Sequence, residues 1–467
     1  MSITERYADY CAGLPDEELP APVVDRAREL LLDVCGIAIG AARAGSTPSI
    51  VKAARALDGG GEGATVLATG EQMRPELAAF VNASLAHSLD YDETHRAGSI
   101  HPAASVVGAA LAAGEHTDAD GDRLLTAIVG GYEVAARLGM AISPASHMAR
   151  GFHGTGTCGT FGATAAAGIV YGLDRAGFET AFGVNGSQAA GSLQFLEDGA
   201  WNKRTHPGFA ARSALSSVAL AEQDFEATAA PIEGVRGFLQ GYSDDADPAL
   251  ATAGLGDRFE ITQAGIKPYP CCRYMHAAMD GLLELASAEG IDQAAVTAVE
   301  IGLAGAARDV VEPTKPVPET VVDAQFSMPF ATALTLTRRR ATVEDFLAVE
   351  RDELDADRRR LIEATSVTTS DWADDQYPDR WAATVRIETT DDTYETRVES
   401  ARGDPENPLS WAELTEKYAE LVEPVMGEAG DALGERIASA DSQSVRELLE
   451  PVRTARDDAR IDALERA

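Results

Sequence analysis

The feature that most constrains the fold is a series of helical segments whose side chains are almost all small and apolar. Residues 101–222 give one such segment after another, and the helix expected over 20–43 ends in a stretch that is apolar nearly all round. A helix without a polar face has to be buried on every side, and Gly and Ala allow neighbouring helices to approach closely. We therefore expect the first part of the chain to form a large helical domain.

The sequence changes character near Gln263. An extended, proline-fixed segment over 266–273 leads into a helix near Tyr274. Four β-rich stretches follow, with helical stretches between them, and the last two alternate in the manner of a hairpin. This mixture predicts a smaller α+β domain, whose β-rich stretches cover 296–303, 366–370, 381–389 and 393–398.

The fold class is therefore mainly α, with a large all-helical domain and a smaller α+β domain. We expect the helical domain to span 1–264 and the α+β domain to span 265–402. A proline-containing linker opens the last range, 403–467, in which we expect a helix over 411–425, N-capped by Ser410, and two further helices. These helices resemble the first domain in character, so we expect them to pack back on it.

The charge of the chain excludes one class of partner. The chain carries 75 acidic and 39 basic residues, a net charge of −36, so the phosphates of a nucleic acid would be repelled. Few of the basic residues are lysines. An acidic, lysine-poor surface is typical of proteins adapted to high salt, where counterions screen the repulsion. An ordinary acidic protein from a GC-rich genome is the alternative.

The sequence predicts a protein that is directed neither to a membrane nor to an oxidising compartment. Its first residues lack the regions of a signal peptide, and no apolar run approaches the ~20 residues of a membrane helix. The 5 cysteines form no Cys-x-x-Cys pair, which predicts free thiols. Adjacent cysteines such as Cys271 and Cys272 rarely have metal-ligand geometry. We expect a cytoplasmic protein without a metal site and without membrane contact.

A dense polar stretch, 87–102, follows an apolar helix that we expect over 76–89. It holds three imidazoles, three carboxylates and several hydroxyls. A titratable loop between buried helices is costly unless its groups are paired or used. A solvated surface loop is the alternative for any one of these residues.

Further histidines stand in glycine-, proline- or polar-rich breaks, namely His153, His206 and His276. Two of the rare lysines, Lys203 and Lys267, share these breaks. A compact ammonium group suits a small, carboxylate-rich substrate in a way that the planar guanidinium of arginine does not. Structural histidines and a chance placement of the lysines are the alternatives.

Several sequence blocks occur in a fixed order along the chain. They read SLDYDETH followed by HPAA, GFHGTGTCGTFGA, GSQAAGSLQFLEDGAWNKRTHPGFAA, KPYPCCRYMHAAMDG, QFSMPF and NPLSWAEL. In these blocks, and over nearly its full length, the chain resembles the MmgE/PrpD family. That family contains 2-methylcitrate dehydratase, cis-aconitate decarboxylase and an iminodisuccinate epimerase.

The resemblance implies a helical domain, an α+β lid domain, a homodimer, and catalysis without a cofactor in a site between the domains. The chain departs from citrate-type members of the family in one place. Cys271, Cys272 and Arg273 stand where those members commonly have a histidine, and His276 is the nearest one. The matching positions imply catalytic residues Asp90, Thr94, His101 and His153, and substrate-binding residues Lys203, Lys267, Tyr269 and His276.

These residue types suit proton transfer beside a carboxylate. Removing such a proton creates an enolate, whose charge lysines hold in a dry pocket while histidine or aspartate moves protons. The resemblance implies a lyase acting on a small di- or tricarboxylate, in the first place by dehydrating a 2-methylcitrate-like hydroxy acid. The alternatives in the same family are a cis-aconitate-type decarboxylase and a dicarboxylate epimerase. Outside it, they are a metal-dependent hydrolase using Asp90, Asp92 and His95, and a carboxylate-binding protein without activity.

A salt titration tests the interpretation of the charge. We expect the melting temperature to rise steeply between dilute buffer and molar potassium chloride, because counterions screen the repulsion that a net charge of −36 creates. Thermal unfolding followed by circular dichroism at several salt concentrations measures the effect. A melting temperature that does not change with salt would contradict adaptation to high salt.

Overall fold

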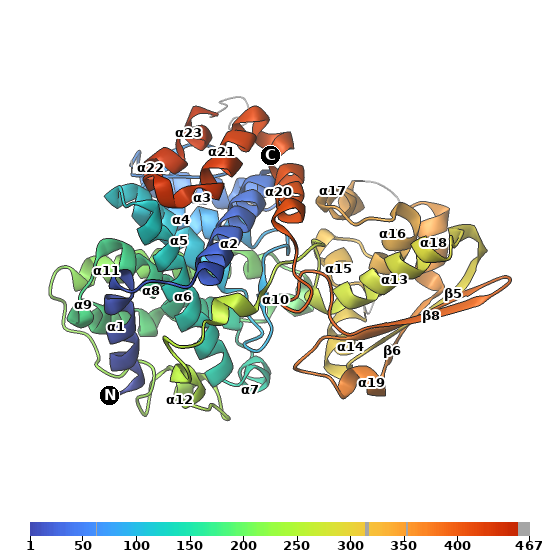
Figure 1. The fold of residues 1–467 in the computed structure, drawn as a ribbon, viewed down its shortest axis with the longest axis horizontal. Helices are drawn as coiled ribbons and strands as arrows, with labels where there is room; N and C mark the ends of the chain where they lie inside the picture. The colour runs from blue at the N-terminus through green and yellow to red at the C-terminus, as the bar shows by residue number, and fades with distance from the viewer. Residues whose placement is uncertain (62, 313–316, 352–353, 456–467) are drawn as a thin grey trace. The chain divides into compact units, whose positions relative to one another are not determined.

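The structure, a computed structural model, describes residues 1–61, 63–312, 317–351 and 354–455 of the chain. The chain divides into two compact units (Figure 1). Unit 1 is built from three segments and unit 2 from two. The α+β domain was expected to span 265–402. Unit 2 contains this range and, in addition, residues 89–91 and 403–409. The segments of unit 1 are 1–88, 92–264 and 410–467, and those of unit 2 are 89–91 and 265–409.

Unit 1 is built almost wholly from helices. Short strands β1 (Ala64–Thr65) and β2 (Gln72–Met73) form an antiparallel pair, and β3 (Thr94–His95) lies in the polar stretch. Strand β4 (Ala264–Gly265) stands where the chain passes into unit 2. The helices of unit 1 are α1 (Ile3–Gly13), α2 (Ala21–Gly40), α3 (Thr47–Asp58), α4 (Pro75–Ala86), α5 (Pro102–Thr117), α6 (Gly121–Ala141), α7 (Pro144–Ala149), α8 (Gly154–Tyr171), α9 (Arg175–Asn185), α10 (Phe195–Asp198), α11 (Asn202–Ala221), α12 (Phe238–Tyr242), α20 (Trp411–Met426), α21 (Glu428–Ala438), α22 (Val445–Leu448) and α23 (Glu450–Thr454).

Backbones approach closely at the centre of unit 1, where α8 packs against both α5 and α6. A Cβ atom added to Gly131 of α6 would lie 2.7 Å from the carbonyl oxygen of Gly162 in α8. One added to Gly162 would lie 2.6 Å from the carbonyl oxygen of Gly131. Real Cβ atoms do not come so close to a backbone oxygen, so only glycine fits at this crossing.

Helix α6 corrects one expectation from the sequence, because its length and composition do meet those of a membrane-spanning helix. Of its most apolar window, however, 89% is buried inside the structure. The core of unit 1 therefore accounts for the apolar surface of this helix.

The C-terminal helices belong to unit 1, where α20 packs along α2 (Figure 1). Ser410 caps α20 as expected: its hydroxyl accepts a hydrogen bond from the backbone N–H of Glu413, whose carboxylate accepts one from the N–H of Ser410. Within this helix pair, the ammonium of Lys417 lies 2.6 Å from the carboxylate of Asp33, and both side chains are buried. Each charge compensates the other in a position where neither is tolerated alone.

Unit 2 combines a mixed sheet with helices, and its strands run in the order β6–β5–β7–β8. Strand β5 (Val296–Leu303) pairs in parallel with β6 (Thr365–Thr369) and antiparallel with β7 (Ala383–Thr389), which forms a hairpin with β8 (Thr393–Val398). Buried residues alternate with more exposed ones along the first part of β7, and α13 packs against β7 and β8 (Figure 1). The helices of unit 2 are α13 (His276–Ala288), α14 (Gly305–Val311), α15 (Val321–Gln325), α16 (Met328–Arg338), α17 (Val343–Leu347), α18 (Ala356–Glu363) and α19 (Asp371–Asp374).

The predicted fold class, mainly α with a smaller α+β part, is confirmed. Each of the four β-rich stretches forms one strand of the sheet, and the expected hairpin is β7 and β8. One helix end is wrong, because the helix expected over 76–89 ends at Ala86. Beyond α20, the described residues form α21, α22 and α23, where two helices were expected.

The helix crossing at Gly131 predicts a specific cost of overpacking. We expect Gly131→Ala to destabilise the protein by about 1–3 kcal/mol, because the new methyl group forces α6 and α8 apart. Gly241→Ala is the matched control, since a Cβ atom at Gly241 would meet nothing within 4 Å. Urea unfolding of the two variants measures the difference. Equal midpoints would show that α6 and α8 can separate without cost.

Candidate active site

Four histidine rings gather in unit 1, and each stands at or near the end of a helix. His87 follows α4, His101 and His153 directly precede α5 and α8, and His206 lies in the second turn of α11. The ring centre of His87 lies 5.3 Å from that of His101 and 5.8 Å from that of His153. The ring centres of His153 and His206 lie 5.1 Å apart. We refer to these rings as the histidine cluster.

Local structure brings the starts of α5 and α8 together. Pro102 occupies the first position of α5, which leaves His101 as the N-cap residue. The backbone N–H of His101 donates to the hydroxyl of Thr155 in the first turn of α8, at 3.2 Å. The N–H of His153 donates to the carbonyl of Gly191, at 2.9 Å. Two helix starts and a crossing loop thereby fix the backbone at both histidines.

His87 is paired with a carboxylate. Its Nδ1 lies 2.6 Å from Oδ2 of Asp92, and both side chains are buried. The carboxylate accepts the hydrogen bond, so Nδ1 carries the proton of the neutral ring and Nε2 carries the lone pair. This Nε2 is buried and has no hydrogen-bond partner among the residues that the structure describes. His87 is therefore a candidate base whose acceptor atom is left for a ligand.

His101 is fixed in one tautomer by the backbone. Its Nδ1 donates to the carbonyl oxygen of Glu93 at 2.5 Å, and the hydroxyl of Thr94 lies 3.3 Å from the same nitrogen. A carbonyl can only accept, so Nε2 carries the lone pair of the neutral ring. The carboxylate of Glu93 accepts from the backbone N–H of Ala103 at 2.8 Å, in the first turn of α5. This contact holds Glu93, and with it the acceptor of His101, against the helix start.

His153 and His206 share one hydrogen bond between their Nδ1 atoms, at 2.9 Å. One ring must donate and the other accept, which requires a lone pair on one of the two facing nitrogens. Burial lowers the pKa of His153 well below its usual range, and the nearby His87, His206 and Lys203 add to the effect. Burial, His87 and Lys203 lower the pKa of His206 to about 4. Both rings are therefore neutral at pH 7.

The cluster can take up protons when an anion enters it. Lys203 precedes His206 by one turn of α11, so the two side chains share a face of the helix. An anion bound beside Lys203 opposes the effects that hold the pKa values of these rings down. Neutral imidazoles then become able to accept a proton and to return it to a substrate.

Lys267 and Asp90, both in unit 2, form a buried ion pair. The ammonium of Lys267 donates to the carboxylate of Asp90 at 2.8 Å and to the backbone carbonyl of the same residue at 2.9 Å. The backbone of Asp90 has a φ of 51°, in the left-handed region that few non-glycine residues occupy. The double contact with Lys267 helps to hold this conformation.

Tyr269 and His276, in unit 2, bond to protein groups. The Tyr269 hydroxyl donates to Asp280 at 2.6 Å. Nδ1 of His276 accepts from the guanidinium of Arg273 at 2.7 Å, so its proton lies on Nε2, which donates to the carbonyl of Cys271 at 3.2 Å. Burial, with Arg273 and Lys267, lowers the pKa of His276 well below its usual range. His276 is thus a buried, neutral ring that connects the guanidinium of Arg273 to the backbone carbonyl of Cys271.

The structure separates the predicted residues into two groups. It brings His101, His153, Thr94 and Lys203 together in unit 1, and it places Asp90, Lys267, Tyr269 and His276 in unit 2. The site residues expected from the sequence did not include His87, its partner Asp92 or His206, although all three lie in stretches that the sequence had marked as polar. The spacing of Lys203 and His206 on one helix was a usable signal for the last of these.

The residues of the metal-dependent alternative have separate partners. Asp90 pairs with Lys267, Asp92 with His87, and His95 with Glu260. Within the described ranges, no group of three or more His, Cys, Asp or Glu side chains has an arrangement that could hold a metal ion. The ligand set that this hydrolase requires is therefore not assembled there.

Two family models together match nearly the whole chain. The family model for the MmgE/PrpD N-terminal domain matches residues 5–251, and that for the MmgE/PrpD C-terminal domain matches residues 269–459. A cis-aconitate decarboxylase from Aspergillus terreus is 29% identical over 296 residues, which cover 61% of this chain and 60% of the relative. The human cis-aconitate decarboxylase is 27% identical over 263 residues, 54% of this chain and 53% of the relative. The aligned part thus spans little more than half of each relative.

The low pKa of His206 predicts that stability depends on pH. The pKa of His206 is about 4 in the folded protein, against an ordinary value of 6.5 in the unfolded chain. Between pH 4 and pH 6.5, the unfolded chain therefore binds a proton at His206 that the folded protein does not bind. The free energy of unfolding should therefore fall as the pH is lowered from 6.5 towards 4, and less steeply in His206→Asn. Urea unfolding across this window measures both slopes.

The control for this experiment is His116→Asn, because the ring of His116 is exposed and lies outside the cluster. It should keep the wild-type slope. A wild-type slope in His206→Asn would mean that His206 titrates in the folded protein as it does in the unfolded chain.

Proposed function

The chain belongs to the MmgE/PrpD family, and we propose that it is a carboxy-lyase that removes carbon dioxide from a small unsaturated tricarboxylate of the cis-aconitate type. The observation that carries the proposal is the histidine cluster, in which neutral rings stand beside the ammonium of Lys203. The relatives named above, which are cis-aconitate decarboxylases, supply the substrate class.

Electrostatics favour Lys203 as the group that attracts the substrate. The net charge of −36 opposes the approach of a tricarboxylate, so a local positive group has to reverse the field. Lys203 lies in the first turn of α11, where backbone N–H groups also favour an anion. In our proposal it holds the carboxylate next to the carbon that gains an electron pair.

The proposed reaction consumes one proton. The bond between the methylene carbon and its carboxylate breaks, and carbon dioxide leaves. The electron pair forms a new double bond between the methylene and central carbons, and the former double-bond pair moves to the outer carbon, beside a carboxylate. That carbon takes a proton from an imidazolium. A tricarboxylate trianion and one proton thus give a dicarboxylate dianion and carbon dioxide.

We assign the proton transfer to the histidine cluster. His101 and His153 were expected to be catalytic from the sequence, and each presents a ring at a helix start. We add His87, because the carboxylate of Asp92 fixes the orientation of its ring and its Nε2 is directed to no other described residue. The negative charge of the bound substrate then stabilises a protonated imidazole in the cluster. The proton stays there until the outer carbon of the substrate accepts it.

Dehydration of a 2-methylcitrate-like hydroxy acid, our first expectation, has less support than decarboxylation. The same side chains would serve either reaction, so the choice rests on the relatives, whose names are those of decarboxylases. Epimerisation has no observation of its own in its favour. A homodimer, a cytoplasmic location, the absence of a cofactor and substrate-binding roles for Lys267, Tyr269 and His276 stay predictions. The carboxylate and carbonyl partners of Tyr269 and His276 favour structural roles for these two.

The test measures turnover of cis-aconitate by the purified protein in molar salt. Release of carbon dioxide together with proton uptake is expected, and nuclear magnetic resonance identifies the product. We expect His153→Asn to lower kcat by roughly 10²–10⁴-fold, because a positioned acid or base contributes about that much. The exposed His116 provides the control His116→Asn, which should turn over like the wild type.

The outcomes separate the alternatives. Conversion of 2-methylcitrate to an alkene without release of carbon dioxide would replace decarboxylation by dehydration. Binding of either acid without turnover would favour a carboxylate-binding protein. Wild-type kcat in His153→Asn would remove the histidine cluster from the mechanism.

A further inference from the structure

His95 belongs to the polar stretch that carries His87 and His101, yet its ring forms hydrogen bonds outside the histidine cluster. It opens a short antiparallel turn: its N–H donates to the carbonyl of Ile100 at 2.9 Å, and the N–H of Ile100 donates back to the carbonyl of His95 at 3.3 Å. The turn therefore lies between Thr94 and His101, both of which belong to the candidate site. Whatever fixes His95 also fixes the backbone that leads into His101.

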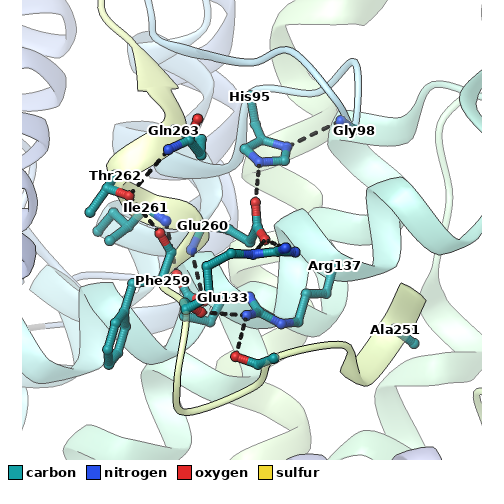
Figure 2. Close-up of polar contacts among 12 residues, drawn as sticks. His95, Gly98, Glu133, Arg137, Ala251, Phe259, Glu260, Ile261, Thr262 and Gln263 are labelled. Carbon is teal, nitrogen blue, oxygen red and sulfur yellow. Dashed lines mark hydrogen bonds and ion pairs between the residues drawn. The ribbon is translucent and has the colours of Figure 1, made fainter. Parts of the chain in front are cut away.

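The ring of His95 is held in one tautomer by contacts on both nitrogens (Figure 2). The N–H of Gly98 donates to its Nδ1 at 3.1 Å, so the ring proton lies on Nε2. Nε2 then donates to the carboxylate of Glu260 at 3.3 Å. His95 and Glu260 are both buried. The donor on His95 thus depends on a single buried acceptor.

Glu260 is in turn fixed on α6 (Figure 2). The carboxylate of Glu133 accepts from the N–H of Glu260 at 3.0 Å and from that of Ile261 at 2.8 Å. Arg137, one turn further along α6, pairs with Glu133 and donates to the carbonyl of Arg258 at 2.5 Å. Burial alone would raise the pKa of Glu260, but its hydrogen bonds from His95 and Arg258 lower it to about 2. A permanent carboxylate therefore faces His95.

The same helix also meets the turn at its tip. A Cβ atom added to Gly139 of α6 would lie 3.2 Å from Cα of Gly98, so the two backbones are in contact there. The turn is thus anchored to α6 directly at Gly98 and through Glu260 at His95. These two contacts fix the position of the backbone on either side of the turn. This backbone includes the carbonyl of Glu93, which orients His101.

We propose that Glu260, acting through His95, is a positioning residue for His101 in the reaction proposed above. It touches no ring of the histidine cluster in the contacts described, so its effect is indirect. The inference rests on the proposed function for its kinetic consequence, but the geometry of His101 can be measured without turnover. A small displacement of a catalytic group costs about 10²-fold in rate, so a loss of this anchor should be visible.

The experiment compares Glu260→Ala, Glu260→Gln and Arg258→Gln in the full-length protein. The first removes the acceptor of His95, and the second keeps an oxygen that can accept. The third is the matched control, because Arg258 binds the other oxygen of Glu260, at 2.6 Å, and its side chain is 62% exposed. If Glu260→Ala does not fold, His95→Asn replaces it, since asparagine is too short to reach Glu260.

Two readouts are measured well below the melting temperature. The first is kcat and KM for cis-aconitate. The second is the Nδ1–H signal of His101 in protein labelled with ¹⁵N histidine, assigned by its absence from His101→Asn. In Glu260→Ala we expect kcat to fall on the order of 10–100-fold with little change in KM, and the Nδ1–H proton to exchange faster with water. Glu260→Gln and Arg258→Gln should resemble the wild type in both readouts.

Other results overturn the proposal. Glu260→Ala that melts at a lower temperature, yet keeps the wild-type kcat and His101 signal, would make Glu260 a structural residue only. An equal loss in Glu260→Gln or Arg258→Gln would assign the effect to charge instead of the hydrogen bond to His95. If the wild type does not turn over cis-aconitate, the proposed function fails, and the His101 signal alone decides whether Glu260 positions that ring.

Discussion

Burial of several imidazoles without charge is the constraint on which the candidate site depends. A protonated ring loses its hydration inside unit 1, and the neighbours of His153 and His206 include other rings and an ammonium group, so these two rings are held neutral. Neutral rings need defined tautomers, because each nitrogen is then either a donor or an acceptor. The carboxylate of Asp92, the carbonyl of Glu93 and the facing nitrogens of His153 and His206 meet this need.

The acidic residues of the polar stretch serve different ends. Asp92 orients His87, Glu93 caps the start of α5, and Asp90 pairs with Lys267 in unit 2. None of the three is a solvated surface charge, since all are buried. Each of these three buried carboxylates thus meets a donor within the protein. This is why charge density along the sequence did not reveal the function of any one carboxylate.

The sequence predicts the elements of the fold better than the members of the site. All-round apolar character correctly identified buried helices, and alternation identified β7 and β8, because both patterns are local. The end of α4 was extended through His87, which hid its pairing with Asp92. That helix end precedes Asp90, whose left-handed backbone is bonded to Lys267, far along the chain. Such a contact leaves no periodic signal, so no pattern within the stretch could have predicted it.

The pair formed by Asp33 and Lys417 has a consequence for how the chain folds as it is made. Helix α2 leaves the ribosome before unit 2, whereas α20, which packs against α2, follows all of unit 2. Domains generally fold in the order of synthesis. Here unit 1 cannot close until the segment after unit 2 has been synthesised, so unit 2 is free to complete its sheet first. Until α20 is made, the face of α2 with Gly36 and Gly40 stays uncovered, and it is this face that a chaperone acting on the nascent chain would meet.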